Sequence, residues 1–76
     1  MIINLYSTGC PKCNVLEKKL NTANIDFKII TDMDKIEKIC EATGNDMLPL
    51  LEIEEGGETR IYGFSEAIKW VGEYNA

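Results

Sequence analysis

The sequence has 76 residues, of which 45% are hydrophobic and 28% are charged, a composition typical of folded proteins and too apolar for a disordered one. A chain of this length can build one small hydrophobic core, so we expect a single domain over residues 1–76 that works as a monomer. Its net charge of −5 repels phosphate backbones and anionic membrane surfaces, which argues against nucleic acid or a membrane as partner.

The first residues lack a basic stretch followed by a long apolar run, and no segment reaches the roughly 18 apolar residues of a membrane span. We therefore expect a cytoplasmic protein. Its three cysteines are an odd number, so they cannot all pair within one chain. In a reducing compartment, two cysteines close together in sequence favour catalysis or metal binding over a structural disulfide.

The predicted elements of the first half alternate between strands and helices. Ile2–Tyr6 is a short apolar run, as expected of a strand covered on both faces. Residues 11–24 form an amphipathic helix that begins with proline, and residues 26–30 form a second strand. Residues 31–34 resemble a weak capping signal for a helix that ends at residues 44–45.

The second half predicts a β-hairpin and a last helix. Strands over residues 49–54 and Glu58–Tyr62 flank two turn glycines. Ser65 is the expected N-cap of the last helix, whose inner stripe contains Ala67, Ile68, Val71 and Tyr74. With a parallel first βαβ unit and an antiparallel hairpin, the order βαβαββα predicts an α/β fold of a four-stranded mixed sheet and three helices.

Cys10 and Cys13 form a Cys-x-x-Cys pair where the first predicted helix begins. With Pro11 at the first helical position, Cys10 occupies the N-cap, where the free backbone N–H groups of Lys12 and Cys13 can donate to it. The positive end of the helix dipole and the Lys12 ammonium also favour a thiolate there. We therefore predict that Cys10 is the nucleophile and that Cys13, one turn later, resolves the mixed disulfide that Cys10 forms.

Two other interpretations of the cysteine pair stay open. Cysteines at this spacing also occur as purely structural residues, and such a pair can supply half of a zinc site. The sequence has no histidine, and Cys40 would add only a third sulfur, so we expect no resident metal or permanent cofactor. Cys40 falls on the inner stripe of its helix with Ile36 and Ile39, where a free cysteine packs as a small hydrophobe.

The segment YSTGCPKC, residues 6–13, resembles the active-site segment of glutaredoxins, members of the thioredoxin-fold superfamily, and the resemblance extends along nearly the whole chain. It implies a thioredoxin fold, reduction of protein or glutathione mixed disulfides, and glutathione as reductant. Residues 47–49, MLP, are similar in position to the family's Thr-Val-Pro. This similarity implies a cis Pro49 facing the cysteines and a backbone contact from Leu48 to the substrate. A proline that merely opens an edge strand is the alternative.

Residues 63–65, GFS, are similar to the turn that holds a carboxylate of glutathione, which implies substrate contacts at Gly63 and Ser65 besides the capping role. The chain departs from the glutaredoxin pattern in a shorter loop before Cys10 and in Lys12, which replaces a common tyrosine and becomes the expected substrate-binding cation. The Gly63-Phe64 pair also resembles redoxins that donate electrons to ribonucleotide reductase and are reduced by thioredoxin reductase. That function stays open, as does a noncatalytic metal-binding or adaptor role.

Overall fold

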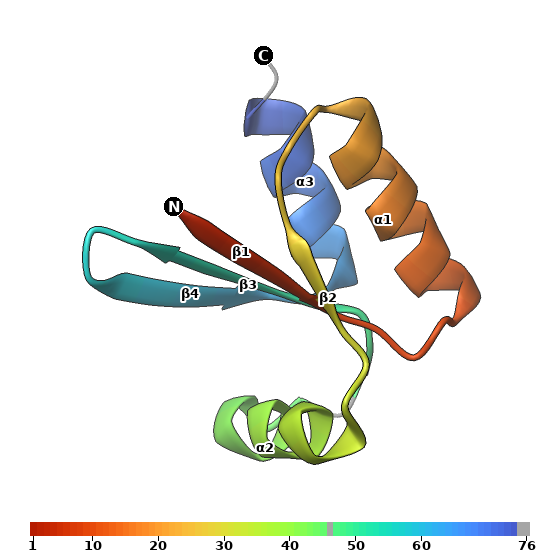
Figure 1. The fold of residues 1–76 in the computed structure, drawn as a ribbon, viewed down its shortest axis with the longest axis vertical. Coiled ribbons are helices and arrows are strands. Elements are labelled where there is room, and N and C mark those ends of the chain that lie inside the picture. Colours follow the sequence, from red (N-terminus) through yellow and green to blue (C-terminus); the bar gives the residue numbers. More distant parts are fainter. Residues whose placement is uncertain (46, 75–76) are drawn as a thin grey trace.

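The computed structural model of the protein describes residues 1–45 and 47–74. These residues form a four-stranded sheet and three helices, in the order predicted from the sequence (Figure 1). The elements are β1 (Ile2–Tyr6), α1 (Pro11–Thr22), β2 (Lys28–Ile30), α2 (Met33–Thr43), β3 (Leu50–Glu55), β4 (Glu58–Tyr62) and α3 (Phe64–Tyr74). Within the described part of the chain, no helix is both long enough and apolar enough to cross a bilayer.

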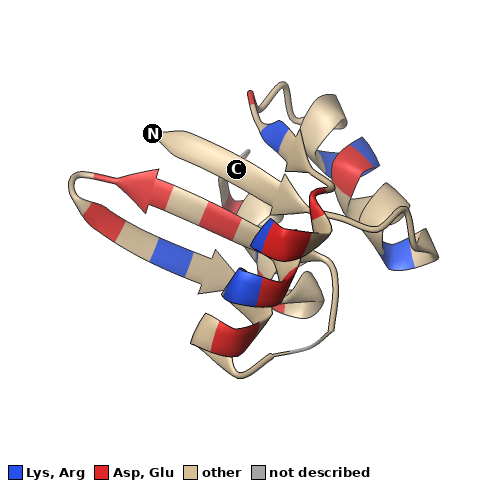
Figure 2. Ribbon diagram, turned by 60° about the horizontal axis from the view of Figure 1, so that its bottom comes forward, with Lys and Arg blue, Asp and Glu red and all other residues tan. Residues whose placement is uncertain are grey.

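The strands lie in the order β2-β1-β3-β4, with β1 parallel to β2 and antiparallel to β3, and with β3 antiparallel to β4. This arrangement confirms the predicted mixed sheet. Helices α1 and α3 cover one face of the sheet, and α2 lies on the other (Figure 1). The inner strand β1 carries no charged residue, whereas charged residues alternate with uncharged ones along much of the hairpin (Figure 2). β1 therefore has the composition of a strand buried on both faces.

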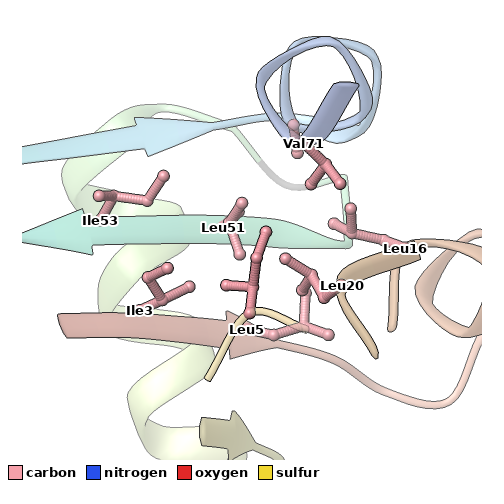
Figure 3. Close-up of a cluster of buried hydrophobic side chains, with 9 residues drawn as sticks. Ile3, Leu5, Leu16, Leu20, Leu51, Ile53 and Val71 are labelled. Atoms are coloured by element: carbon pink, nitrogen blue, oxygen red, sulfur yellow. The ribbon is translucent and has the colours of Figure 1, made fainter. Parts of the chain in front are cut away.

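The larger hydrophobic cluster lies between the sheet and helices α1 and α3 (Figure 3). Its members come from both of these helices, from β1 and β3, and from the loop after α1: Ile3, Leu5, Leu16, Leu20, Ile25, Leu51, Ile53, Ala67 and Val71. A smaller cluster under α2 joins Tyr6, Ile36, Ile39 and Leu50, and the partly buried Cys40 packs against it as expected. Helix α1, which carries the cysteine pair, is thus fixed to the sheet by the larger cluster.

Two element boundaries in the first half differ from the prediction. Helix α1 ends at Thr22 because the Ile25 N–H donates to the Leu20 carbonyl at 3.1 Å and Asn24 adopts a left-handed φ of 57°, both features of helix C-termini. Strand β2 is Lys28–Ile30, shorter than the predicted 26–30, because its pairing with β1 begins only at Lys28. An apolar sequence pattern predicts an extended segment, but it does not show which of its residues pair with a neighbouring strand.

The second half also requires corrections. Ser65 is not the N-cap of α3: the helix begins at Phe64, and the Gly63 carbonyl accepts the Ala67 N–H at 2.8 Å, which makes Gly63 the cap. Tyr74 does not belong to the buried stripe, since 51% of it is exposed and its ring stacks on Trp70. Strand β3 begins after the predicted residue 49, at a residue whose backbone N–H can join the ladder.

Candidate functional site

Cys10 is the N-cap of α1, and proline follows it in the first turn, as predicted. The backbone N–H of Cys13 donates to the Cys10 sulfur at 3.2 Å, and the Cys10 carbonyl accepts the Asn14 N–H at 3.0 Å. We expected Lys12 as a second backbone donor, but the bond to the sulfur comes from Cys13. The Cys10 sulfur therefore lies at the positive end of the helix dipole, where a negative charge is stabilised.

The two cysteines differ in accessibility. All three cysteines of the chain are free thiols; Cys10 is partly exposed, whereas the exposed fraction of Cys13 is 0%. Burial, the largest influence, raises the pKa of Cys13, but hydrogen bonds from Cys10, from Ser7 and from the backbone outweigh it, so this pKa lies below its usual value. Of the two sulfurs, the one that an incoming molecule can reach is therefore that of Cys10.

Residues far along the chain complete the surroundings of Cys10. The Leu48–Pro49 peptide bond is cis, as the family resemblance implied. The Cys10 thiol points at the carbonyl oxygen of Leu48, with 3.9 Å between sulfur and oxygen. Leu48 and the fully buried Pro49 therefore lie next to Cys10, although 38 residues separate Cys10 from Leu48 in the sequence.

A groove of about 260 Å³ lies beside the cysteines, where α1 and α3 begin. The predicted substrate-binding residues line it together: Lys12, Leu48, Pro49, Gly63 and Ser65. The ammonium of Lys12 lies 5.6 Å from the centre of the Phe64 ring, a cation–π contact that joins the first turns of the two helices. The fold thus brings three separate predicted segments to one surface.

Sequence reasoning missed four residues that also line the groove: Asn45, Met47, Phe64 and Glu66. The Asn45 side-chain oxygen accepts the Met47 N–H at 2.9 Å, so these two lining residues are held together. The sequence signal for this wall is the asparagine directly after the glycine that ends α2, a pattern that by itself indicates only a helix end. Met47 is 65% exposed, so it presents an apolar side chain at the rim.

A metal site is the other chemistry that a Cys-x-x-Cys pair can support. Over residues 1–45 and 47–74, no group of three or more histidine, cysteine, aspartate or glutamate side chains is arranged to hold a metal ion. Cys40, the third sulfur considered for a zinc site, belongs to α2 and packs in the smaller cluster. Its contacts are those of a packing residue.

Neither the comparison with known protein families nor the comparison with curated proteins finds a match for this chain. Among solved structures, the chain is similar to maleylacetoacetate isomerase from Anaeromyxobacter dehalogenans 2CP-1, with a TM-score of 0.73 and 22% sequence identity. The similarity covers 97% of this chain but 37% of the isomerase chain, whose active site holds dicarboxyethyl glutathione and citrate. Together with the element order and strand pairing, this similarity shows that the chain has a thioredoxin fold.

Proposed function

We propose that this protein is a glutaredoxin-like thiol-disulfide oxidoreductase that reduces protein or glutathione mixed disulfides through Cys10 and Cys13. The observation that carries the proposal is the hydrogen bond of 3.2 Å from the Cys13 N–H to the sulfur of a partly exposed Cys10. Reactive cysteines typically have a partly exposed sulfur at a helix N-terminus, whereas structural cysteines are buried and inert. The buried Cys13 is the partner that such a nucleophile needs for a dithiol cycle.

In the proposed cycle, the Cys10 thiolate attacks one sulfur of a substrate disulfide. A bond forms between Cys10 and that sulfur, the substrate S–S bond breaks, and the other substrate sulfur leaves as a thiolate that takes a proton from water. Cys13 then attacks the Cys10 sulfur, and the second substrate thiolate leaves. Two electrons have passed to the substrate, and the protein holds a Cys10–Cys13 disulfide. Two glutathione molecules, oxidised to glutathione disulfide, restore the dithiol.

We assign the groove to the thiol partner. Lys12 supplies a positive charge for one carboxylate, and the backbone of Leu48 offers an edge for strand-like pairing beside Cys10. The first turn of α3, at Gly63 and Ser65, has free N–H groups that suit a second carboxylate. Glutathione carries two carboxylates. The glutathione derivative in the active site of the similar isomerase supports glutathione as the ligand.

The proposal is tested by the redox equilibrium of the Cys10–Cys13 pair against buffers of reduced and oxidised glutathione, with thiols counted by mass-tagging. We expect the pair to titrate as one two-electron couple. Cys13→Ser should trap one glutathione on Cys10, because the resolving thiol is gone. A pair that stays reduced or oxidised across all buffers, with no adduct in Cys13→Ser, would falsify the proposal.

A second candidate function has the same dithiol chemistry at Cys10 and Cys13 but a protein, not glutathione, as the partner. The exposed Met47 and the ring of Phe64 give the groove an apolar part that a protein surface would cover better than a small peptide. This favours an electron donor to a protein such as ribonucleotide reductase, reduced by thioredoxin reductase. Rapid reduction of the disulfide by thioredoxin reductase, with slow reduction by glutathione, would select this function over the first.

The proposal treats residues 1–76 as one domain, because the cysteines and the groove walls come from both halves of the chain. It also places the protein in the cytoplasm, where small thiols keep a dithiol of this kind reduced.

A further inference from the structure

Phe64, the first residue of α3, lines the groove but has no part in the proposed redox cycle. It is partly buried and packs against the larger hydrophobic cluster, so its ring has a fixed place in the groove wall. The Lys12 ammonium lies over this ring, 5.6 Å from its centre. Phe64 is therefore the fixed member of a pair whose other member is the predicted substrate-binding cation.

Without the ring, the ammonium of Lys12 would be poorly placed to bind a ligand. The side chain is exposed and has a long, flexible stem, so its charged end could occupy many positions in solvent. Ordering such a side chain costs conformational entropy when a carboxylate binds. The negative face of the Phe64 ring attracts the ammonium and restricts it to the groove. Part of the ordering is thereby complete before the ligand binds.

An aromatic ring holds a cation without cancelling its charge. The groove also contains the Glu66 carboxylate, in the first turn of α3, and an ion pair with Glu66 would neutralise the Lys12 ammonium. Over residues 1–45 and 47–74, an ion pair joins Arg60 to Glu58 on β4, and none joins Lys12 to Glu66. Held on the ring, the ammonium keeps its charge available for a carboxylate of the thiol partner.

We propose that Phe64 is a positioning residue that acts through Lys12: its ring holds the ammonium in the groove and so increases the preference of Cys10 for disulfides that carry carboxylates. The inference rests on the proposed function and deepens it, because it assigns recognition of substrate charge to one contact between α1 and α3. Phe64 takes no part in bond formation. Its effect is on the choice of disulfide, and the reactivity of the Cys10 sulfur stays the same.

The preference is measured in the Cys13→Ser variant, where the mixed disulfide on Cys10 accumulates. The Cys10 thiolate attacks glutathione disulfide, forms a bond to one glutathione sulfur and releases the other glutathione as a thiolate. Hydroxyethyl disulfide reacts in the same way but carries no charge. Mass spectrometry gives both rates, and the ratio of the glutathione rate to the hydroxyethyl rate reports charge recognition.

Fluorine atoms on the Phe64 ring withdraw electrons from its face and change its shape little, so they weaken a cation–π contact selectively. We expect Phe64→trifluorophenylalanine to lower the ratio of the two rates about twofold, the size of one exposed cation–π contact, through the glutathione rate alone. Mono- and difluorinated rings should give intermediate ratios.

Two controls separate this contact from packing. Phe27→trifluorophenylalanine alters the other phenylalanine, which packs against the larger cluster and does not line the groove, so the ratio should not change. In a Lys12→Ala background, fluorination of Phe64 should have no further effect. A ratio that fluorination of Phe64 leaves unchanged, or that falls equally in Lys12→Ala, would overturn the role of Phe64 while Cys10 still reacts. A Cys10 that reacts with neither disulfide would instead overturn the proposed function, and this inference with it.

Discussion

The cysteine segment, residues 7–13, and the groove wall, residues 45, 47–49 and 63–66, are held in different ways. In the cysteine segment, Ser7 and Cys13 are buried, and hydrogen bonds fix the sulfur of Cys10 and the hydroxyl of Ser7. The groove wall instead presents exposed side chains such as Met47, with Lys12 of α1 reaching across to it. In the proposed function, buried contacts position the two sulfurs and exposed side chains contact the substrate. Loss of the nucleophile Cys10 should abolish turnover, whereas changes in the groove, including its cation Lys12, should have graded effects.

The largest expected effect is the loss of the nucleophile. Cys10→Ser should lower turnover of a glutathione mixed disulfide by more than about a thousandfold, because no other accessible sulfur lies at the helix N-terminus among the described residues. Cys40→Ser is the matched control, since it makes the same replacement in a packing residue and should leave turnover nearly unchanged. Turnover is measured as release of glutathione. Turnover that persists in Cys10→Ser would contradict the assignment of Cys10 as the nucleophile.

The next effect concerns the helix that carries both cysteines. Leu16 is fully buried in the larger cluster, whereas the neighbouring Val15 is 45% exposed. Leu16→Ala should lower the free energy of unfolding by about 2–5 kcal/mol, because it leaves a cavity between α1 and the sheet. Val15→Ala should change it by less than about 0.5 kcal/mol. Denaturant unfolding followed by Trp70 fluorescence measures both, and similar values for the two variants would contradict the buried attachment of α1.

The same contrast explains what could be predicted from the sequence. The cysteine segment was predictable because its signals are local: Cys10 as N-cap, Pro11 in the first turn, and an apolar strand just before them. The predicted N-cap of α3, Ser65, was wrong because glycine and serine are both favoured at this position. Only the hydrogen bond from the Ala67 N–H to the Gly63 carbonyl distinguishes them.

Most of the groove was not predictable from local patterns. The contact between Lys12 and Phe64 joins two helices that are far apart in the sequence, and it exists only once α1 and α3 pack on the same face of the sheet. Asn45 reaches the groove for the same reason, since its wall position depends on the tertiary placement of the loop after α2. The family resemblance supplied Leu48, Pro49, Gly63 and Ser65, which spacing alone would have left as turn and strand residues.

A graded effect is expected for Lys12, the cation of the groove. Lys12→Ala should raise the KM for glutathione about two- to fivefold and leave kcat nearly unchanged, because an exposed charge contributes little binding energy and does not take part in bond formation. The dependence of KM on ionic strength should weaken in the variant. Lys35→Ala removes another exposed lysine, from α2, and serves as the control. A large loss of kcat in Lys12→Ala would show that Lys12 acts on the reacting sulfur instead.

The smallest effect is expected at the groove rim and distinguishes small from large substrates. Met47→Ser should leave the free energy of unfolding within about 0.5 kcal/mol of the wild type, because Met47 is 65% exposed, and should not alter the KM for glutathione. For a folded protein disulfide, the KM should rise about two- to threefold, since one exposed apolar contact is lost. Met33→Ser, at the 56% exposed start of α2, is the matched control. Equal effects of the two variants on the protein substrate would mean that the rim does not contact it, and the second candidate function would lose its structural support.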